Sequence, residues 1–313
     1  MNRPPRRLAR TTALAVAGSL AVAGCGSSKI AGTAGTAPNA SRPMNAQSAD
    51  QALVALVPAA LRARGTVRIA TDPTYAPNAF KDPNGDIIGM EVDLGNAIFT
   101  RLGLKPQWQS ADFGIIIGGL DAKKYDLGLA SFTDTREREK QLDMVGYFNA
   151  GEAIATLAGN PYKLTGNAED LCGIRVAVQT NTIEATEIAE TINPACTKAG
   201  KPEIPDNGDR FNAQTDAVSA LVAKRAQAMM ADSPVVDYVV QQSNGRLMKI
   251  GSAYNTAPYG IAIPKGDGRL AEAVQGALKG LINDGTYVQI LTKWGVQSGA
   301  LTADQVLINA ATG

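Results

Sequence analysis

The segment "SFTDTREREKQLD", residues 131–143, carries charged residues whose spacing has an evident chemical use. Asp134 or Thr135 can cap a helix there, which puts Arg136 and Arg138 in its first turn. Cations are disfavoured at that position, because the helix dipole is positive at its start. A guanidinium beside free backbone N–H groups is, however, well suited to clamp an anion. The alternative is a solvated face on which the arginines pair with acidic residues three or four positions away.

The sequence lacks the side chains on which most catalytic and metal sites depend. It contains no histidine, which excludes histidine bases and histidine metal ligands. Its three cysteines form no CxxC pair, and we find no P-loop, GxSxG or GxGxxG motif. We therefore expect no catalytic residues, no metal and no cofactor.

The charge balance gives no reason to expect a nucleic-acid partner. Lys and Arg number 30 and Asp and Glu 29, for a net charge of +1. Four arginines lie in the first ten residues, which we expect to be removed, so 26 basic residues remain against 29 acidic ones, a net charge of −3. Such a chain lacks the basic surface that binds a phosphate backbone.

The start of the sequence predicts export and lipidation. A basic stretch, "MNRPPRRLAR", precedes an apolar run too short to span a bilayer comfortably, so residues 1–24 are predicted to be a signal peptide. Small residues stand directly before Cys25, as in a bacterial lipobox, although an ordinary signal peptide with a chance cysteine is the alternative. Residues 25–49 are small and polar, which predicts a flexible linker. We therefore expect a lipid-anchored protein on the extracytoplasmic face of the cell membrane.

The rest of the chain alternates between strand and helix patterns. Residues 66–70 and 173–179 read as short buried strands, and residues 91–103 and 269–284 carry helical apolar stripes. This pattern favours an α/β fold with a mostly parallel sheet and helices on both faces. Two similar α/β lobes fit the length, with a ligand in the crevice at the carboxyl ends of the strands.

The motifs and their order resemble the family 3 solute-binding proteins of amino-acid ABC transporters, which include glutamine-binding and lysine/arginine/ornithine-binding proteins. The resemblance spans roughly residues 51–295. The segments that carry it are "TVRIATDPTYAP", "IIGMEVDLGNAI", "DFGIIIGGLDAKKYDL", "SFTDTREREKQLD", "GIRVAVQTNT", "MMADSP" and "PYGIAIPKG…NDGTYVQILTKWG".

This resemblance implies a two-lobed periplasmic-binding-protein-like fold of type II, with the ligand in the cleft between the lobes. Lobe 1 would comprise residues 50–151 and 257–313, and lobe 2 residues 152–256. Two hinge strands would join them near Tyr147–Gly151 and Ala257–Tyr259.

The resemblance also assigns Arg138 a role. In this family the arginine of a T-x-x-R segment holds the α-carboxylate of the ligand, and the matching segment here is "TRER". Ser131 and Thr133 match residues that bind the α-ammonium and α-carboxylate groups, although such a pair before a helix also serves as a cap. Asp232 matches the carboxylate that pairs with the α-ammonium group. Alternatively, Asp232 is the N-cap residue of the helix that begins near Pro234. Ser233 can also cap that helix, which would leave Asp232 free to bind the ligand.

Four further residues match ligand contacts of the family, and their roles are less certain from the sequence alone. Tyr75 and Phe113 match aromatic walls around the ligand stem, although either residue is equally typical of a core. Thr182 and Ile183 match ligand contacts, but Asn181 replaces the usual glycine before them; asparagine tolerates the left-handed backbone that this loop needs.

Asp72 matches a position that reaches the far end of the ligand side chain. An ionised carboxylate only accepts hydrogen bonds, so it suits ammonium, guanidinium or amide groups. Gln179 matches a further ligand contact, at which glutamine-binding relatives carry lysine. Its neutral amide does not compensate the charge of Asp72. We predict basic amino acids first, glutamine or asparagine second, and acidic ones last. The alternative is that Asp72 only caps its own loop in an Asx turn.

Cys172 and Cys196 both fall in lobe 2. Because Cys25 is predicted to carry the lipid, Cys172 and Cys196 are the two cysteines that remain. In an oxidising compartment they are predicted to form a disulfide; the alternative is two buried free thiols.

The function that the resemblance implies is that of a monomeric receptor without catalysis. It would deliver a free amino acid to a membrane permease and its ATPase. Two alternatives stay open: an enzyme similar to cyclohexadienyl dehydratases, which share this fold, and a sensor lipoprotein that reports ligand occupancy to a signalling partner.

Overall fold

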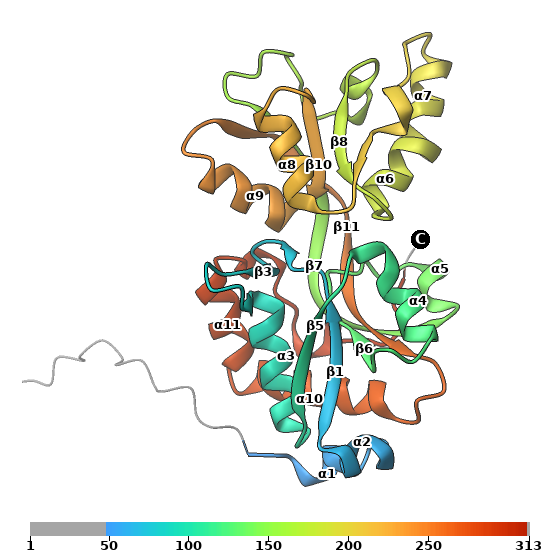
Figure 1. The fold of residues 1–313 in the computed structure, drawn as a ribbon, viewed down its shortest axis with the longest axis vertical. Coiled ribbons are helices and arrows are strands. Elements are labelled where there is room, and N and C mark those ends of the chain that lie inside the picture. Colours follow the sequence, from blue (N-terminus) through green and yellow to red (C-terminus); the bar gives the residue numbers. More distant parts are fainter. Residues whose placement is uncertain (1–47, 312–313) are drawn as a thin grey trace, which may run out of the picture. The chain divides into compact units, whose positions relative to one another are not determined.

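The computed structural model describes residues 48–311. Eight of the described strands form one mixed sheet in the order β5-β1-β6-β11-β7-β10-β8-β9. Its centre is an antiparallel pair of two long strands, β7 (Leu142–Leu157) and β11 (Leu247–Pro264). Figure 1 shows these two strands running from one group of elements to the other. Each group is called a lobe below.

Lobe 1 contains the β5-β1-β6 side of the sheet, in which β1 pairs in parallel with both neighbours. A separate three-stranded sheet, β2-β3-β4, and several helices complete it. Its strands are β1 (Thr66–Thr71), β2 (Thr74–Tyr75), β3 (Ala79–Lys81), β4 (Ile87–Ile88), β5 (Lys105–Ser110) and β6 (Leu127–Gly128). Its helices are α1 (Gln51–Val54), α2 (Ala59–Arg64), α3 (Met90–Arg101), α4 (Ile116–Asp121), α5 (Arg136–Glu139), α10 (Leu270–Asn283) and α11 (Thr286–Trp294).

Lobe 2 contains the β10-β8-β9 side, in which β8 pairs in parallel with both neighbours. Its strands are β8 (Val176–Gln179), β9 (Asp209–Phe211) and β10 (Ala228–Asp232). Its helices are α6 (Ile183–Glu187), α7 (Asn193–Lys198), α8 (Gln214–Val222) and α9 (Ser233–Gln242). A disulfide between Cys172 and Cys196 closes a loop of 24 residues in this lobe, as predicted. A loop of that size stabilises the fold by about 3 kcal/mol in the chain-entropy model.

The expected strand–helix alternation is confirmed, but the expected parallel sheet is wrong at its centre. β7 pairs antiparallel with both β11 and β10. The chain therefore crosses between the lobes twice in opposite directions. The predicted hinge segments lie in these strands, where Ala150 pairs with Ala257 and Phe148 with Tyr259.

Each lobe has its own hydrophobic core. In lobe 1 the apolar stripe of α10, which includes Val274 and Leu278, packs against α3 and the sheet. Lobe 2 has one cluster on each face of its sheet: Met229 points into one and Met230 into the other. Neighbouring strand residues point to opposite faces, so this arrangement follows from the pleat. Each lobe can thus hold its side of a cleft as a rigid unit.

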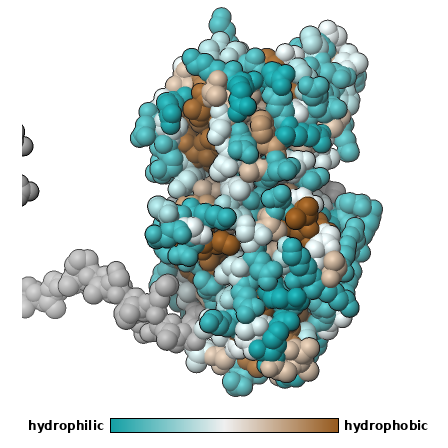
Figure 2. Space-filling model, in the orientation of Figure 1, coloured by the Kyte–Doolittle hydropathy of each residue, from teal (hydrophilic) through white to brown (hydrophobic). Residues whose placement is uncertain are grey.

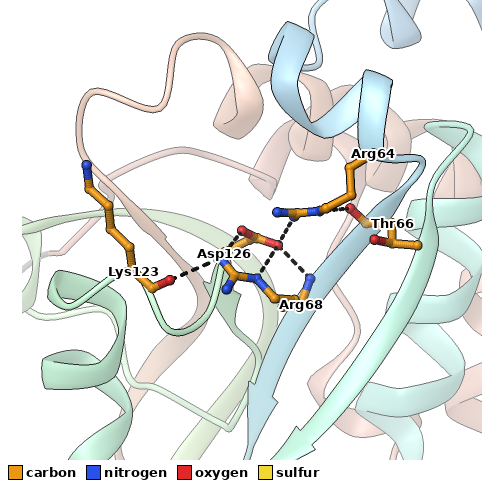
Figure 3. Close-up of polar contacts among 5 residues, drawn as sticks. All are labelled: Arg64, Thr66, Arg68, Lys123 and Asp126. Carbon is orange, nitrogen blue, oxygen red and sulfur yellow. Dashed lines mark hydrogen bonds and ion pairs between the residues drawn. The ribbon is translucent and has the colours of Figure 1, made fainter.

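A charged cluster fixes lobe 1 where β1 meets β6. Figure 3 shows Asp126 between Arg64 and Arg68. Asp126 accepts hydrogen bonds from the Arg68 backbone N–H at 2.7 Å and from its Nη2 at 2.8 Å, and it also pairs with Arg64. The guanidinium of Arg68 in turn donates to the carbonyl oxygen of Lys123 at 3.0 Å. These bonds lock the residue before β6 onto β1.

On the face drawn in Figure 2, hydrophilic side chains dominate and the hydrophobic ones form small separate patches. Within residues 48–311 no helix has both the length and the apolar character needed to cross a membrane.

Candidate functional site

A pocket lies between the lobes. All ten residues predicted as ligand contacts line it, and two more join them. The lobe 1 residues are Asp72, Tyr75, Phe113, Ala130, Ser131, Thr133 and Arg138; the lobe 2 residues are Gln179, Thr182, Ile183, Glu184 and Asp232. The structure thus brings together side chains that lie up to 160 positions apart in the sequence.

Arg138 lies in the single turn of α5, capped by Thr135, whose Oγ1 accepts from the Arg138 N–H at 3.3 Å. Its Nη1 donates to the carbonyl oxygen of Thr133 at 2.8 Å, and its Cζ lies 5.3 Å from the ring centre of Phe132 and 5.6 Å from that of Phe113. Burial lowers its pKa to about 10, while nearby carboxylates, Asp232 first, oppose the shift. Arg138 therefore faces the pocket as a cation, and among the described residues no carboxylate forms an ion pair with it.

Asp232 and Tyr75 connect the two lobes. The Tyr75 hydroxyl donates to Asp232 Oδ2 at 2.7 Å. Asp232 occupies the N-cap position of α9 but makes no side-chain cap bond. The expectation that Ser233 would cap was wrong, because Ser233 begins the helix and its Oγ accepts from the Gly151 N–H at 3.4 Å. Burial raises the pKa of Asp232, although the Tyr75 bond and the Arg138 charge oppose this.

Asp72 divides its two carboxylate oxygens between its own loop and the pocket. Oδ1 accepts from the Thr74 N–H at 3.1 Å, which is the Asx turn considered above. Oδ2 accepts from Gln179 Nε2 at 2.5 Å, and the same amide nitrogen donates to the carbonyl oxygen of Asn212 at 2.8 Å. Burial raises the pKa of Asp72 against these hydrogen bonds. The Asx turn is therefore present, and Asp72 also lines the pocket; its contact with the ligand stays a prediction.

Ser131 is held by a buried glutamate that the sequence reasoning missed. Its N–H and its hydroxyl each donate to Glu91 Oε1 at 2.7 Å, and its Oγ accepts from Asn78 Nδ2 at 2.8 Å. Burial raises the pKa of Glu91 to about 7, although its bonds to Tyr147 and Ser131 oppose the shift. Ser131 has a φ of 52°, a strained backbone that these bonds maintain. The capping alternative for Ser131 and Thr133 was wrong, because Thr135 caps α5.

Thr182 and Ile183 start α6. Thr182 is the N-cap, and its Oγ1 accepts from the Ala185 N–H at 3.3 Å and donates to the Gln179 carbonyl oxygen at 3.0 Å. Asn181 has a φ of 63°, so it does adopt the left-handed backbone that a glycine would supply.

Glu184 is the main pocket residue that sequence reasoning missed. It is 1% exposed, and its Oε1 has no hydrogen-bond partner within the described part of the chain. Burial, followed by the charge of Asp232, raises its pKa to about 8. The signal in the sequence was its position one residue after Ile183. Side chains tilt toward the helix N-terminus, which here faces the pocket.

The pocket therefore combines one cation, Arg138, with three carboxylates, Asp72, Glu184 and Asp232. No group of His, Cys, Asp or Glu residues able to hold a metal ion occurs in residues 48–311. The predicted lipidation site Cys25 and the signal peptide lie outside the described residues.

Comparisons with known proteins agree with this geometry. Residues 67–297 match the family model described as bacterial extracellular solute-binding proteins, family 3. The arginine-binding protein ArgT of Corynebacterium glutamicum is 34% identical over 255 residues, which is 82% of each chain. A solved structure of an ancestral arginine-binding protein bound to glutamine is 34% identical with a TM-score of 0.66, and the match covers 74% of this chain and 99% of that one. An ancestral amino acid-binding protein described as a precursor of cyclohexadienyl dehydratase is 32% identical with a TM-score of 0.67, covering 75% and 97%. The predicted two-lobed fold is confirmed.

Proposed function

This chain belongs to the bacterial extracellular solute-binding proteins, family 3, and we propose that it binds a free, positively charged amino acid for import. Arginine is the first candidate, lysine and ornithine follow, and glutamine or asparagine come next. The protein releases its ligand unchanged to a membrane permease driven by an ATPase.

The charge inventory of the pocket carries this proposal. The guanidinium of Arg138 and the carboxylates of Asp72 and Asp232 leave an excess of negative charge in a space that is largely shielded from water. Glu184, whose pKa is raised to about 8, is largely protonated near neutrality and adds to this negative charge only at higher pH. Charges interact strongly in such an environment, so the pocket favours a ligand with one carboxylate and two cationic groups. In this arrangement Arg138 pairs with the α-carboxylate, Asp232 with the α-ammonium group, and Asp72 with the cation at the end of the side chain.

The comparisons support the same order of ligands. The C. glutamicum relative is an arginine-binding protein, and the ancestral arginine-binding protein was solved with glutamine. Both ligands carry N–H donors at the end of the side chain, where Asp72 offers a hydrogen-bond acceptor.

Titration calorimetry of the purified full-length protein tests the proposal. Arginine, lysine, ornithine, glutamine and glutamate are titrated separately. We expect the three basic amino acids to bind most tightly, glutamine more weakly and glutamate not measurably. Tighter binding of glutamate than of arginine would overturn the assignment.

We also propose that the protein is anchored by lipid at Cys25 on the extracytoplasmic face of the membrane. The basic segment, the short apolar run and the small residues before Cys25 support this. Labelling growing cells with a fatty-acid analogue should mark the wild type but not the Cys25→Ala variant. Equal labelling of both would contradict the anchor.

An enzyme of the cyclohexadienyl dehydratase type is the second candidate. It is favoured by the ancestral neighbour and by Glu184, whose raised pKa suits a general acid. Against it stands the set of Arg138 and Asp232, which can bind both charges of an amino acid. Incubation with a cyclohexadienyl acid should give no aromatic product, and formation of that product by the wild type but not by Glu184→Gln would establish the enzyme instead.

A further inference from the structure

The residues that follow α11 return to the part of lobe 1 that carries Arg138. After the 3₁₀ turn Ala303–Gln305 the chain runs alongside β7, where Ile308 forms an antiparallel bridge with Val145. The Gly146 N–H donates to the Leu307 carbonyl oxygen, and the Asn309 N–H to the Met144 carbonyl oxygen, both at 2.9 Å. This segment lies beyond residue 297, where the match to the family model ends.

The next two residues bond to acidic side chains on both sides of Arg138. The Ala310 N–H donates to Asp134 Oδ2 at 2.9 Å, and the Ala311 N–H donates to Glu139 Oε1 at 2.8 Å. Asp134 stands two residues before α5, and Glu139 is its last residue. Both ends of the turn that presents Arg138 are thus tied to one backbone segment.

The α5 turn needs such support. It has four residues, and an isolated helical turn of that length is unstable because nucleation costs more than one turn of hydrogen bonds returns. The backbone of Asp134 is also held by β11, because its N–H donates to the Pro258 carbonyl oxygen at 2.8 Å. Its side chain is 4% exposed, and burial raises its pKa to about 6, which the Ala310 N–H opposes by favouring the ionised form.

We propose that residues 309–311 are a positioning clamp for Arg138, an inference that rests on the function proposed above. Asn309 seats the segment on β7, and the two following N–H groups hold α5 so that the guanidinium meets the ligand's α-carboxylate. The clamp touches neither Asp72 nor Asp232. It therefore sets affinity through the carboxylate end of the ligand and leaves recognition of the side chain unchanged.

Two pairs of variants test the clamp. In the first, the chain shortened after Asn309 loses both N–H donors, while its control, shortened after Ala311, keeps them. In the second, milder pair, Ala311→Pro removes the donor to Glu139. Its control is Ala303→Pro, at the first position of a 3₁₀ turn after an extended Thr302, where proline is well tolerated.

The readouts are calorimetry with arginine and with agmatine, which is arginine without its carboxylate, and hydrogen exchange of the unliganded protein. We expect shortening after Asn309 to lower the affinity for arginine about ten-fold or more. It removes two hydrogen bonds to the carboxylates that hold Arg138 in place for its pairing with the ligand's α-carboxylate. Agmatine affinity should stay within about two-fold, and amides of residues 132–141 should exchange faster while those of lobe 2 do not. Both controls should match the wild type.

Unchanged arginine affinity in the chain shortened after Asn309 would overturn the clamp. So would an equal loss for arginine and agmatine together with faster exchange in both lobes, because that result indicates general destabilisation. If the wild type bound no amino acid, the proposed function would fail, and exchange at residues 132–141 would still decide whether the segment holds α5.

Discussion

Gln179 Nε2 lies 2.5 Å from Asp72 Oδ2, so an amide from lobe 2 bonds directly to the carboxylate of lobe 1 that faces the pocket. The same nitrogen also donates to Asn212, which fixes the amide orientation. An amide supplies hydrogen bonds but no positive charge, and Asp72 keeps its net charge in a buried site. That charge is the basis for the preference for a cationic side chain.

Asp72→Asn should therefore weaken basic ligands far more than neutral ones. Loss of a charged partner in a desolvated pair costs about 2–5 kcal/mol, or roughly 30-fold or more in the dissociation constant. The affinity for glutamine should fall less than about five-fold, because the amide oxygen of the new asparagine still accepts a hydrogen bond. Calorimetry with arginine and glutamine measures both values, and a variant that keeps wild-type affinity for arginine would show that Asp72 serves only its own loop.

Arg138→Ala should abolish measurable binding of every amino acid, because the α-carboxylate is common to all of them. Arg138→Lys keeps the charge but loses the planar fork, so we expect intermediate affinity. The far-UV circular dichroism of both variants should match the wild type. Binding of Arg138→Ala within a few-fold of wild type would mean that another group holds the carboxylate.

Glu184 predicts a pH dependence of binding. Its pKa is raised to about 8 by burial and then by Asp232, so it is largely protonated near neutrality and ionises above that. The other groups around it are Arg138 and Tyr75 from lobe 1, and Glu152 and Glu187 from lobe 2. Because the ionised form attracts a cation, arginine affinity should rise between about pH 7 and pH 9.

The matched pair Glu184→Gln and Glu190→Gln separates this effect from general titration of the protein. Glu184→Gln should flatten the profile, whereas Glu190→Gln, an exposed residue in the helical turn that follows α6, should keep it. An identical slope in both variants would show that Glu184 does not control the pH response.

Asp126 predicts a stability effect without a binding effect. Burial alone would raise its pKa, but the hydrogen bonds from Arg68 and the charges of Arg64 and Arg68 lower it. Asp126→Asn should cost about 1–3 kcal/mol in the free energy of unfolding at neutral pH. A lowered pKa in the folded state stabilises above the unfolded value, so the difference should shrink as pH falls below about 4. Urea unfolding of the wild type and the variant measures this difference in the free energy of unfolding. Unchanged stability would show that the cluster in Figure 3 does not stabilise the fold.

Local patterns predicted the elements of this fold well, and they failed where tertiary pairing decided. The stripe that includes Val274 and Leu278 identified α10, and "GIRVAVQ" identified β8. The antiparallel pairing of β7 with β11 at the centre of the sheet could not be predicted from such local patterns. Strand direction depends on which segments pair, and β7 and β11 are separated by about 90 residues.

The candidate site shows the same division. Its ten predicted residues came from matching motifs, and the residues that hold them came only from the structure. Glu91 supports Ser131 from 40 positions away, and Ala310 reaches Asp134 across 176 positions. Glu184 was missed for a local reason. A glutamate in a first helical turn is already explained by the helix dipole, so its position one residue after the predicted contact Ile183 was not taken as a sign that it faces the pocket.

The comparison of arginine with citrulline tests the central claim most directly. Citrulline has nearly the same shape as arginine, but a neutral ureido group replaces the guanidinium, so the two differ mainly in the charge that Asp72 would meet. The pocket described here predicts that the wild-type protein binds arginine roughly 30-fold or more tightly than citrulline in calorimetry at neutral pH. Equal affinity for the two, within about three-fold, would contradict recognition of a cationic amino acid.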